Sequence, residues 1–151
     1  MKNSLLVIFV LLLAGASVLV HPASPETPSS TGETGSEAPA SEIVAYYFHG
    51  NLRCATCRKI EAYSDEAITQ GFRDELESGQ FAWRVVNTDE SENKHFVKDF
   101  ELITKSVVLV EYRDGEVTRF ENLKLVWQLV GDKDGFLKYV RAETREFMGK
   151  S

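Results

Sequence analysis

Short apolar runs and amphipathic segments alternate along most of the chain, and they predict strands and helices in turn. Residues 43–48 (IVAYYF) form an unbroken apolar run, which is typical of a strand buried on both faces. Residues 81–87 (FAWRVVN) predict a second strand. Residues 107–112 and 116–120 are separated by an Asp-Gly turn signal and predict a β-hairpin.

Helical spacing of apolar residues predicts three helices beside these strands. The longest apolar stripe runs over residues 60–76, and Gly79 ends that helix. The stripe shifts near Ser64, where the sequence YSDEA has the features of a new N-cap, so we expect a break in the helix there. A short helix is predicted over residues 91–101, and a final one from about residue 132 to residue 148.

The elements therefore follow the order β-α-β-α-β-β-α. The first two strands are joined by a helix and should be parallel, whereas the last two are joined by a tight turn and should be antiparallel. The prediction is an α/β fold with a mixed four-stranded sheet that has helices on both faces.

The first twenty residues differ from the rest, because an uncharged and mostly apolar segment follows Lys2. A secretory signal peptide would use residues 5–13 as its apolar segment and residues 14–16 (AGA) as the cleavage site. An uncleaved membrane anchor would use residues 5–20, which span about 24 Å as a helix against a hydrocarbon core of about 30 Å. Both interpretations place the remainder outside the cytoplasm, because the charged residues that follow the segment are acids.

Residues 21–41 (HPASPETPSSTGETGSEAPAS) predict a disordered linker. All 4 prolines of the chain lie here, with no aromatic residue and no aliphatic residue larger than alanine. Such a segment cannot bury enough surface to offset its ordering entropy, and it reaches roughly 60 Å when extended. A stalk of this kind favours the anchor, because a released protein has little use for it. The folded domain is then residues 42–151.

Charge excludes one class of partner. The 23 acids outnumber the 17 lysines and arginines, which gives a formal net charge of −6, and no basic run interrupts that balance. Nucleic acid and a polybasic contact with a membrane surface are therefore not expected.

The 2 cysteines of the chain, Cys54 and Cys57, are spaced C-x-x-C directly after the first predicted strand. As a structural bridge the pair would close a four-residue loop, which contributes about 1.9 kcal/mol in the loop-entropy model against about 3 kcal/mol for fifteen residues. A structural zinc site needs four ligands, so His49 and His95 would have to join the thiolates from separate elements.

Electron exchange with a disulfide fits the placement of the pair best. If a helix starts at or just after Cys54, unpaired backbone N–H groups and the helix dipole stabilise its thiolate. Arg53, Arg58 and Lys59 add positive charge beside the pair. Cys54 would then attack a disulfide, and Cys57, one turn further on and more buried, would resolve the mixed disulfide.

The strand, the C-x-x-C at a helix start and the order of elements resemble the thioredoxin superfamily over residues 42–148. More narrowly, residues 46–57 (YYFHGNLRCATC) resemble a group of small exported thioredoxin-like proteins, some of which carry the label nitrophenyl compound nitroreductase subunit ArsF family. The resemblance implies a thioredoxin fold and dithiol–disulfide exchange, with Cys54 and Cys57 as the matching pair. The flavin chemistry in that label is not transferred, because the sequence has no recognisable flavin site.

The sequence also departs from the thioredoxin pattern. Arg53 replaces the tryptophan before the first cysteine, and residues 55–56 (Ala-Thr) replace Gly-Pro, so no redox direction is assigned. No proline follows Pro39, so Ser106 or Val107 takes the position of the usual cis-proline.

The buried acid of the first strand is absent as well, since that region holds Tyr46, Tyr47 and Phe48. His49 could replace the acid as a proton carrier, because it lies five residues before Cys54. It could equally fix the loop through a hydrogen bond.

These observations predict an extracytoplasmic thiol–disulfide oxidoreductase, in the periplasm or at the cell surface, that is tethered to the inner membrane. It would exchange electrons with a partner protein through Cys54, Cys57 and His49, without a cofactor. Two alternatives stay open. The same thiols and His49 could bind Cu(I) or a metalloid, or the domain could be a non-catalytic interaction adaptor.

Overall fold

The computed structural model of the protein describes residues 41–149. The predicted signal peptide or anchor over residues 1–20 lies outside the described residues, as does the predicted linker up to residue 40. Ser41, the last residue of that linker, is the first residue of a strand. Within residues 41–149, no helix has the length and apolar character needed to cross a membrane.

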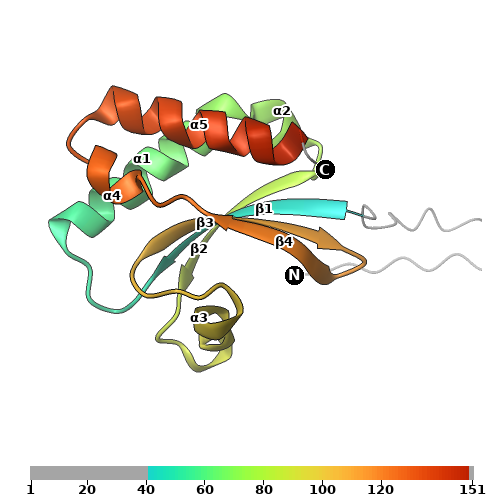
Figure 1. Cartoon of the computed structure of the whole chain (residues 1–151), viewed down its shortest axis with the longest axis horizontal. Coiled ribbons are helices and arrows are strands. Elements are labelled where there is room, and N and C mark those ends of the chain that lie inside the picture. The colour runs from blue at the N-terminus through green and yellow to red at the C-terminus, as the bar shows by residue number, and fades with distance from the viewer. Residues whose placement is uncertain (1–40, 150–151) are drawn as a thin grey trace, which may run out of the picture. The chain divides into compact units, whose positions relative to one another are not determined.

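A mixed four-stranded sheet lies at the centre of the domain, with the strand order β2-β1-β3-β4 (Figure 1). Its strands are β1 (Ser41–His49), β2 (Phe81–Asn87), β3 (Ser106–Arg113) and β4 (Glu116–Asn122). β1 pairs in parallel with β2 and antiparallel with β3, and β3 pairs antiparallel with β4. The predicted strands and their directions are confirmed.

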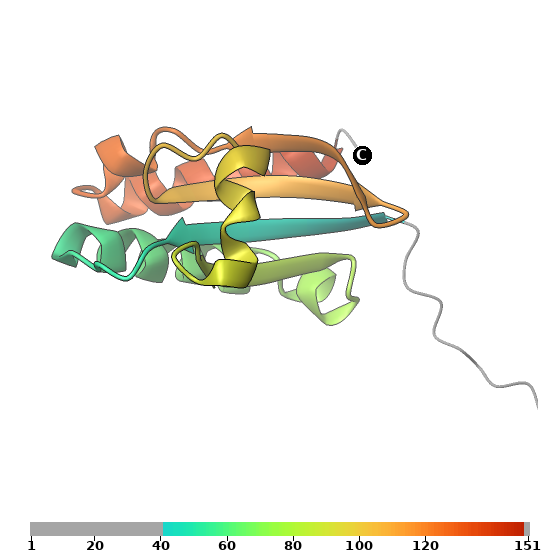
Figure 2. The same cartoon turned by 90° about the horizontal axis from the view of Figure 1, so that it is seen from below.

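Helices cover both faces of this sheet. The helical segments are α1 (Ala55–Gly71), α2 (Arg73–Glu77), the 3-10 turn η1 (Ser91–Asn93), α3 (His95–Asp99), α4 (Val126–Leu129) and α5 (Lys133–Gly149). α1 and α5 lie on one face and α3 lies on the other, which Figure 2 shows in front of the strands. This arrangement is the thioredoxin-like α/β fold that the sequence predicts.

β1 supplies side chains to two separate cores, which explains its unbroken apolar sequence. Successive side chains of a strand point to opposite faces. Ile43, Ala45 and Tyr47 pack in the core under α1 and α5. Their neighbours Val44, Tyr46 and Phe48 pack on the α3 side, where aromatic rings of β1 and of the α3 segment lie against one another. β1 is therefore a central strand that is packed on both faces.

The predicted break at Ser64 is wrong. α1 runs through this position without interruption, and Ser64 is fully buried inside it. The shift of the apolar stripe marks one small polar residue on the packed face of the helix, which is not a boundary. The break lies instead at Phe72, where φ is −140° and ψ is 40°. Gly79, with φ +77°, follows the end of α2 as predicted.

The hairpin turn between β3 and β4 has the predicted chemistry. Asp114 has φ 54° and Gly115 has φ 82°, so both central residues occupy the left-handed region that a type I′ turn requires. α4 has only four residues and was not predicted, because so short a segment shows no periodicity.

Candidate functional site: a dithiol at the start of α1

Cys54 is the N-cap residue of α1, so the predicted helix start is confirmed. Its backbone is extended, with φ −77° and ψ 166°. The Cys57 backbone N–H donates a hydrogen bond to the Cys54 Sγ at 3.1 Å, which satisfies one of the unpaired donors of the first turn. The sulfur of Cys54 therefore lies where a helix stabilises negative charge.

The two cysteines form a disulfide, with a Cα–Cα distance of 5.0 Å. They differ in exposure, since Cys54 is exposed and Cys57 is only 2% exposed. A reagent in solution can thus reach the first sulfur, and the second lies behind it in the core. This asymmetry agrees with the roles that the sequence predicts for an attacking and a resolving thiol.

The β1–α1 loop that carries the pair is held by the segment that follows β2. The His49 carbonyl accepts hydrogen bonds from the backbone N–H of Thr88 at 2.7 Å and from its hydroxyl at 3.1 Å. The Asp89 carboxylate accepts from the Asn51 backbone N–H at 2.7 Å. Asp89 also lies against Gly50, where an added Cβ would be 2.7 Å from its Oδ2. Residues that follow β2 therefore hold the loop in place ahead of the start of α1.

His49 uses both ring nitrogens within this loop. Its Nε2 lies 3.2 Å from Nη1 of Arg53, and its Nδ1 lies 2.9 Å from the Gly50 carbonyl oxygen. A guanidinium only donates, so Nε2 accepts, and the proton on Nδ1 is donated to the carbonyl. Among the described residues, no hydrogen bond joins the ring to either sulfur. The geometry is that of the loop-fixing alternative, and proton transfer by His49 stays a prediction.

Arg53 lies on the flank of α1, beside an acid that sequence analysis did not single out. Its guanidinium forms an ion pair with Glu61, and it lies over the Tyr47 ring at 6.0 Å from the centroid. The Glu61 carboxylate therefore opposes the positive charge that Arg53 was predicted to bring to the dithiol. The only sequence signal for this ion pair was an acid, Glu61, two turns into the helix, and an acid at such a position does not by itself predict a partner.

Tyr47 connects the sheet to the dithiol turn. Its side chain is fully buried, and its hydroxyl donates a hydrogen bond to the Cys57 carbonyl oxygen at 2.8 Å. Burial raises the Tyr47 pKa, and the nearby Arg53 opposes that shift. The sequence marks Tyr47 only as a residue in the place of a missing acid, because nothing in it predicts which backbone group the tyrosine hydroxyl reaches.

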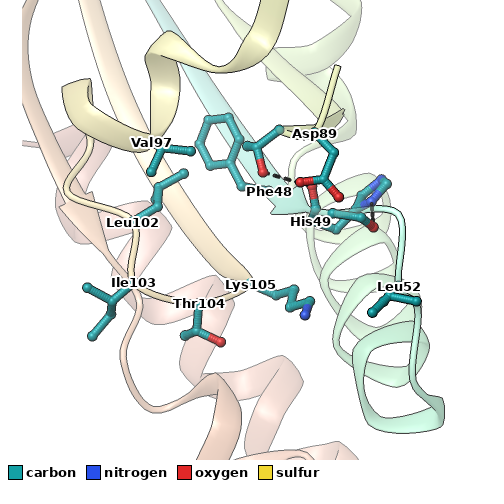
Figure 3. A pocket seen from close by; sticks show the side chains of 11 residues that line it. Phe48, His49, Leu52, Asp89, Val97, Leu102, Ile103, Thr104 and Lys105 are labelled. Carbon is teal, nitrogen blue, oxygen red and sulfur yellow. Dashed lines mark hydrogen bonds between the residues drawn. The ribbon is translucent and has the colours of Figure 1, made fainter. Parts of the chain in front are cut away.

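An open pocket of about 280 Å³ lies beside the β1–α1 loop, and Figure 3 shows its side chains. Two apolar residues at its rim are unusually exposed, with Leu52 at 85% and Ile103 at 98%. The pocket is lined by Phe48, His49, Gly50, Leu52, Thr88, Asp89, Val97, Leu102, Ile103, Thr104 and Lys105. Leu52 belongs to the loop that leads into Cys54, so the pocket and the dithiol share this loop, although neither cysteine lines the pocket.

The segment before β3 forms the other wall of this pocket. Ser106 is the first residue of β3 and pairs with Phe48 at the end of β1, whereas Val107 lies one position further into the sheet. The Trp127 indole N–H donates to the Lys105 carbonyl at 2.9 Å, which occupies a backbone acceptor of this segment. Residues 41–149 contain no cis peptide bond.

Among residues 41–149, metal-ligating side chains are not gathered near the thiols. Within the part of the chain that the structure describes, no group of three or more His, Cys, Asp and Glu side chains is placed to hold a metal ion. His49 was the expected third ligand, and its ring nitrogens already bond to Arg53 and to Gly50. Neither observation favours the metal-binding alternative.

Comparisons with known proteins give structural likenesses and no family. No protein-family model matches the chain, and no curated protein matches it. The crystal structure of Trxlp from Edwardsiella tarda EIB202 is 22% identical with a TM-score of 0.37, over 56% of this chain and 72% of that chain. The oxidised thioredoxin of Plasmodium falciparum is 18% identical with a TM-score of 0.36, over 60% of this chain and 79% of that chain. The thioredoxin of Fasciola hepatica is 16% identical with a TM-score of 0.34, over 65% and 81%.

Proposed function

We propose that the protein is a thiol–disulfide oxidoreductase that exchanges electrons with a partner protein through Cys54 and Cys57. One observation carries the proposal. Cys54 is exposed, and its Sγ caps α1 by accepting the Cys57 N–H, while Cys57 lies buried one turn further on. A structural bridge across four residues contributes too little stability to account for this arrangement.

The exchange proceeds in two balanced steps when the dithiol is the reductant. The Cys54 thiolate attacks one sulfur of the partner's disulfide, so a mixed disulfide forms and one partner thiolate leaves. Cys57 then loses its proton and attacks the Cys54 Sγ, which forms the intramolecular disulfide and releases the second partner thiolate. Two electrons pass to the partner, and the reverse sequence oxidises a partner dithiol. The Cys57 N–H stabilises Cys54 both as nucleophile and as leaving group.

The surroundings of the dithiol suit a polypeptide partner. Leu52 and Ile103 expose apolar side chains at the pocket beside the β1–α1 loop, which leads into Cys54, and Lys105 adds a positive charge there. A partner cysteine that approaches Cys54 would pass over these residues. In this proposal His49 positions the loop, because its ring nitrogens bond to Arg53 and to Gly50.

We also propose that the reaction takes place outside the cytoplasm. The support is sequence alone: the apolar segment over residues 1–20, the acids that follow it, and the resemblance of residues 46–57 to the exported thioredoxin-like group that includes ArsF-labelled proteins. Tethering to the inner membrane by residues 5–20 belongs to the same proposal.

The reaction is tested on the purified full-length chain with Cys57→Ser. The wild type should accelerate reduction of a disulfide-bonded protein substrate by dithiothreitol. When Cys57→Ser is reduced beforehand, freed of dithiothreitol and mixed with the same oxidised substrate, it should stop after the first step and accumulate a mixed disulfide on Cys54, because neither the variant nor the buffer supplies a second thiol to release the substrate. Mass spectrometry of the acid-quenched reaction measures this adduct.

The double variant Cys54→Ser/Cys57→Ser is the matched control. It should give no adduct and only the uncatalysed rate. A wild-type rate equal to that of the double variant contradicts the proposal. Binding of the partner that is unchanged in the double variant would instead favour the interaction adaptor, since that alternative does not need the sulfurs.

A further inference from the structure

We propose that Tyr47 is the positioning residue of the resolving thiol. Its buried hydroxyl holds the Cys57 turn of α1 against β1 and keeps the two sulfurs within reach of each other in the dithiol state. The inference deepens the proposed function and rests on it.

Tyr47 projects from β1, one of the two central strands of the sheet. In the β1 ladders it pairs with Val85 of β2 on one side and with Val107 of β3 on the other. The backbone from which the tyrosine projects is therefore fixed by two neighbours, and its ring is fully buried. The position of the Tyr47 hydroxyl is therefore well defined relative to α1.

The hydroxyl reaches α1 at Cys57, which carries the resolving thiol of the proposed reaction. It donates to the Cys57 carbonyl oxygen at 2.8 Å, ten residues away in sequence. The disulfide itself ties Cys57 to Cys54 in the oxidised state. Reduction removes that covalent tie, and the hydrogen bond from Tyr47 then remains to hold the turn.

Positioning of the Cys57 turn changes the equilibrium between the Cys54–Cys57 disulfide and the dithiol, which can be measured. The tendency of two thiols to form an intramolecular disulfide depends on how often their sulfurs meet, which is an effective concentration. Loss of a fixed Cys57 turn lowers that concentration, so the disulfide becomes less favoured relative to the dithiol. Burial raises the Tyr47 pKa, so its hydroxyl keeps its proton and stays a donor.

The neighbouring tyrosine provides a matched control. Tyr46 precedes Tyr47 on β1 and packs on the opposite face of the sheet, away from α1. Its hydroxyl hydrogen-bonds the Tyr112 hydroxyl at 3.1 Å. Tyr46→Phe and Tyr47→Phe thus remove the same group from adjacent positions of one strand, and each replacement keeps the aromatic ring in its core.

The test compares Tyr47→Phe and Tyr46→Phe in the full-length chain. The reduction potential is measured by equilibration with glutathione buffers, and resolution is measured as the rate at which the mixed disulfide of Cys54 with glutathione converts to the intramolecular disulfide. A typical buried hydrogen bond corresponds to about a fivefold change in an equilibrium constant. Tyr47→Phe should therefore make the potential about 20 mV less negative, because a tenfold change is 29.6 mV, and should slow resolution about fivefold. Tyr46→Phe should leave both values at those of the wild type.

Two results separate the inference from the proposed function. Equal potentials and resolution rates for Tyr47→Phe and the wild type would overturn the role of Tyr47, whatever the unfolding free energy of the variant, since general destabilisation also occurs in Tyr46→Phe. A shifted potential together with no catalysed reduction of any protein disulfide by the wild type would overturn the proposed function and leave the role of Tyr47 intact.

Discussion

Gly50 has little room for a side chain in the loop that leads to the dithiol. An added Cβ would lie 2.7 Å from the Asp89 Oδ2, and that carboxylate is held in place by the Asn51 N–H. Gly50→Ala should therefore lower the free energy of unfolding by about 1 to 2 kcal/mol, because either Asp89 or the loop must move. Denaturant unfolding measures the loss.

Gly131 is the matched control for this substitution, since an added Cβ there meets nothing within 4 Å. Gly131→Ala should change the unfolding free energy by less than about 0.5 kcal/mol. Combining Gly50→Ala with Asp89→Ala should cost less than the sum of the two single changes, since the clash needs both side chains. Strict additivity would contradict the proposed contact.

At the scale of elements, the start of α5 shows how one side chain defines a helix boundary. The Asp132 carbonyl accepts the first helical bond, from Phe136 N–H at 2.9 Å, and its carboxylate accepts from Gly135 N–H at 3.1 Å. Asp132 is thus the N-cap of α5. Asp132→Ala should lower the free energy of unfolding by about 1 kcal/mol, and denaturant unfolding would measure it.

A variant of Asp134 distinguishes the effect of the capping hydrogen bond from the effect of negative charge at the start of α5. It is an acid in the first turn of α5 and is exposed. Asp134→Ala removes a favourable interaction with the helix dipole and should cost only a few tenths of a kcal/mol. Equal losses for the two variants would show that charge, and not the hydrogen bond to Gly135, stabilises this end.

The elements that could be predicted from the sequence are those with a strong local signal. The unbroken apolar run of β1, the Asp-Gly turn of the β3–β4 hairpin and the amphipathic helix from about residue 132 to residue 148 each depend on nearby residues. The continuity of α1 through Ser64 could not be predicted in the same way. It depends on how that face packs in the core, and the packing overrides a local capping preference.

In the candidate site, too, the features with a local sequence signal could be predicted and the long-range contacts could not. Cys54 and Cys57 were predicted because their spacing and their place after β1 are local features. The hydrogen bond from Tyr47 to Cys57 and the ion pair between Arg53 and Glu61 join residues that only the fold brings together. The sequence contains these residues but not their contacts.

At the scale of the whole domain, one buried acid connects the sheet edge to the last helix. Glu111 on β3 is 1% exposed, and its carboxylate accepts hydrogen bonds from Arg113 and from Arg119 of β4. Arg119 also donates to the Phe147 carbonyl, and its guanidinium lies 3.9 Å from the centroid of that ring. The cluster holds β3, β4 and the end of α5 together.

This cluster gives the domain a defined sensitivity to acid. The hydrogen bond from Arg119, reinforced by Arg113, holds the Glu111 pKa below its ordinary value of 4.5, although burial opposes the shift. A carboxyl whose folded pKa is depressed binds more protons in the unfolded chain, so its stabilising contribution is complete above the ordinary pKa and is lost as pH falls through the folded pKa. Glu111→Gln should lower the unfolding free energy by about 2 kcal/mol at pH 7, and this difference from the wild type should shrink as the pH falls below 4.5. Urea unfolding of both proteins across that range provides the measurement, and a difference that stays constant down to the lowest pH would show that Glu111 does not carry the acid response.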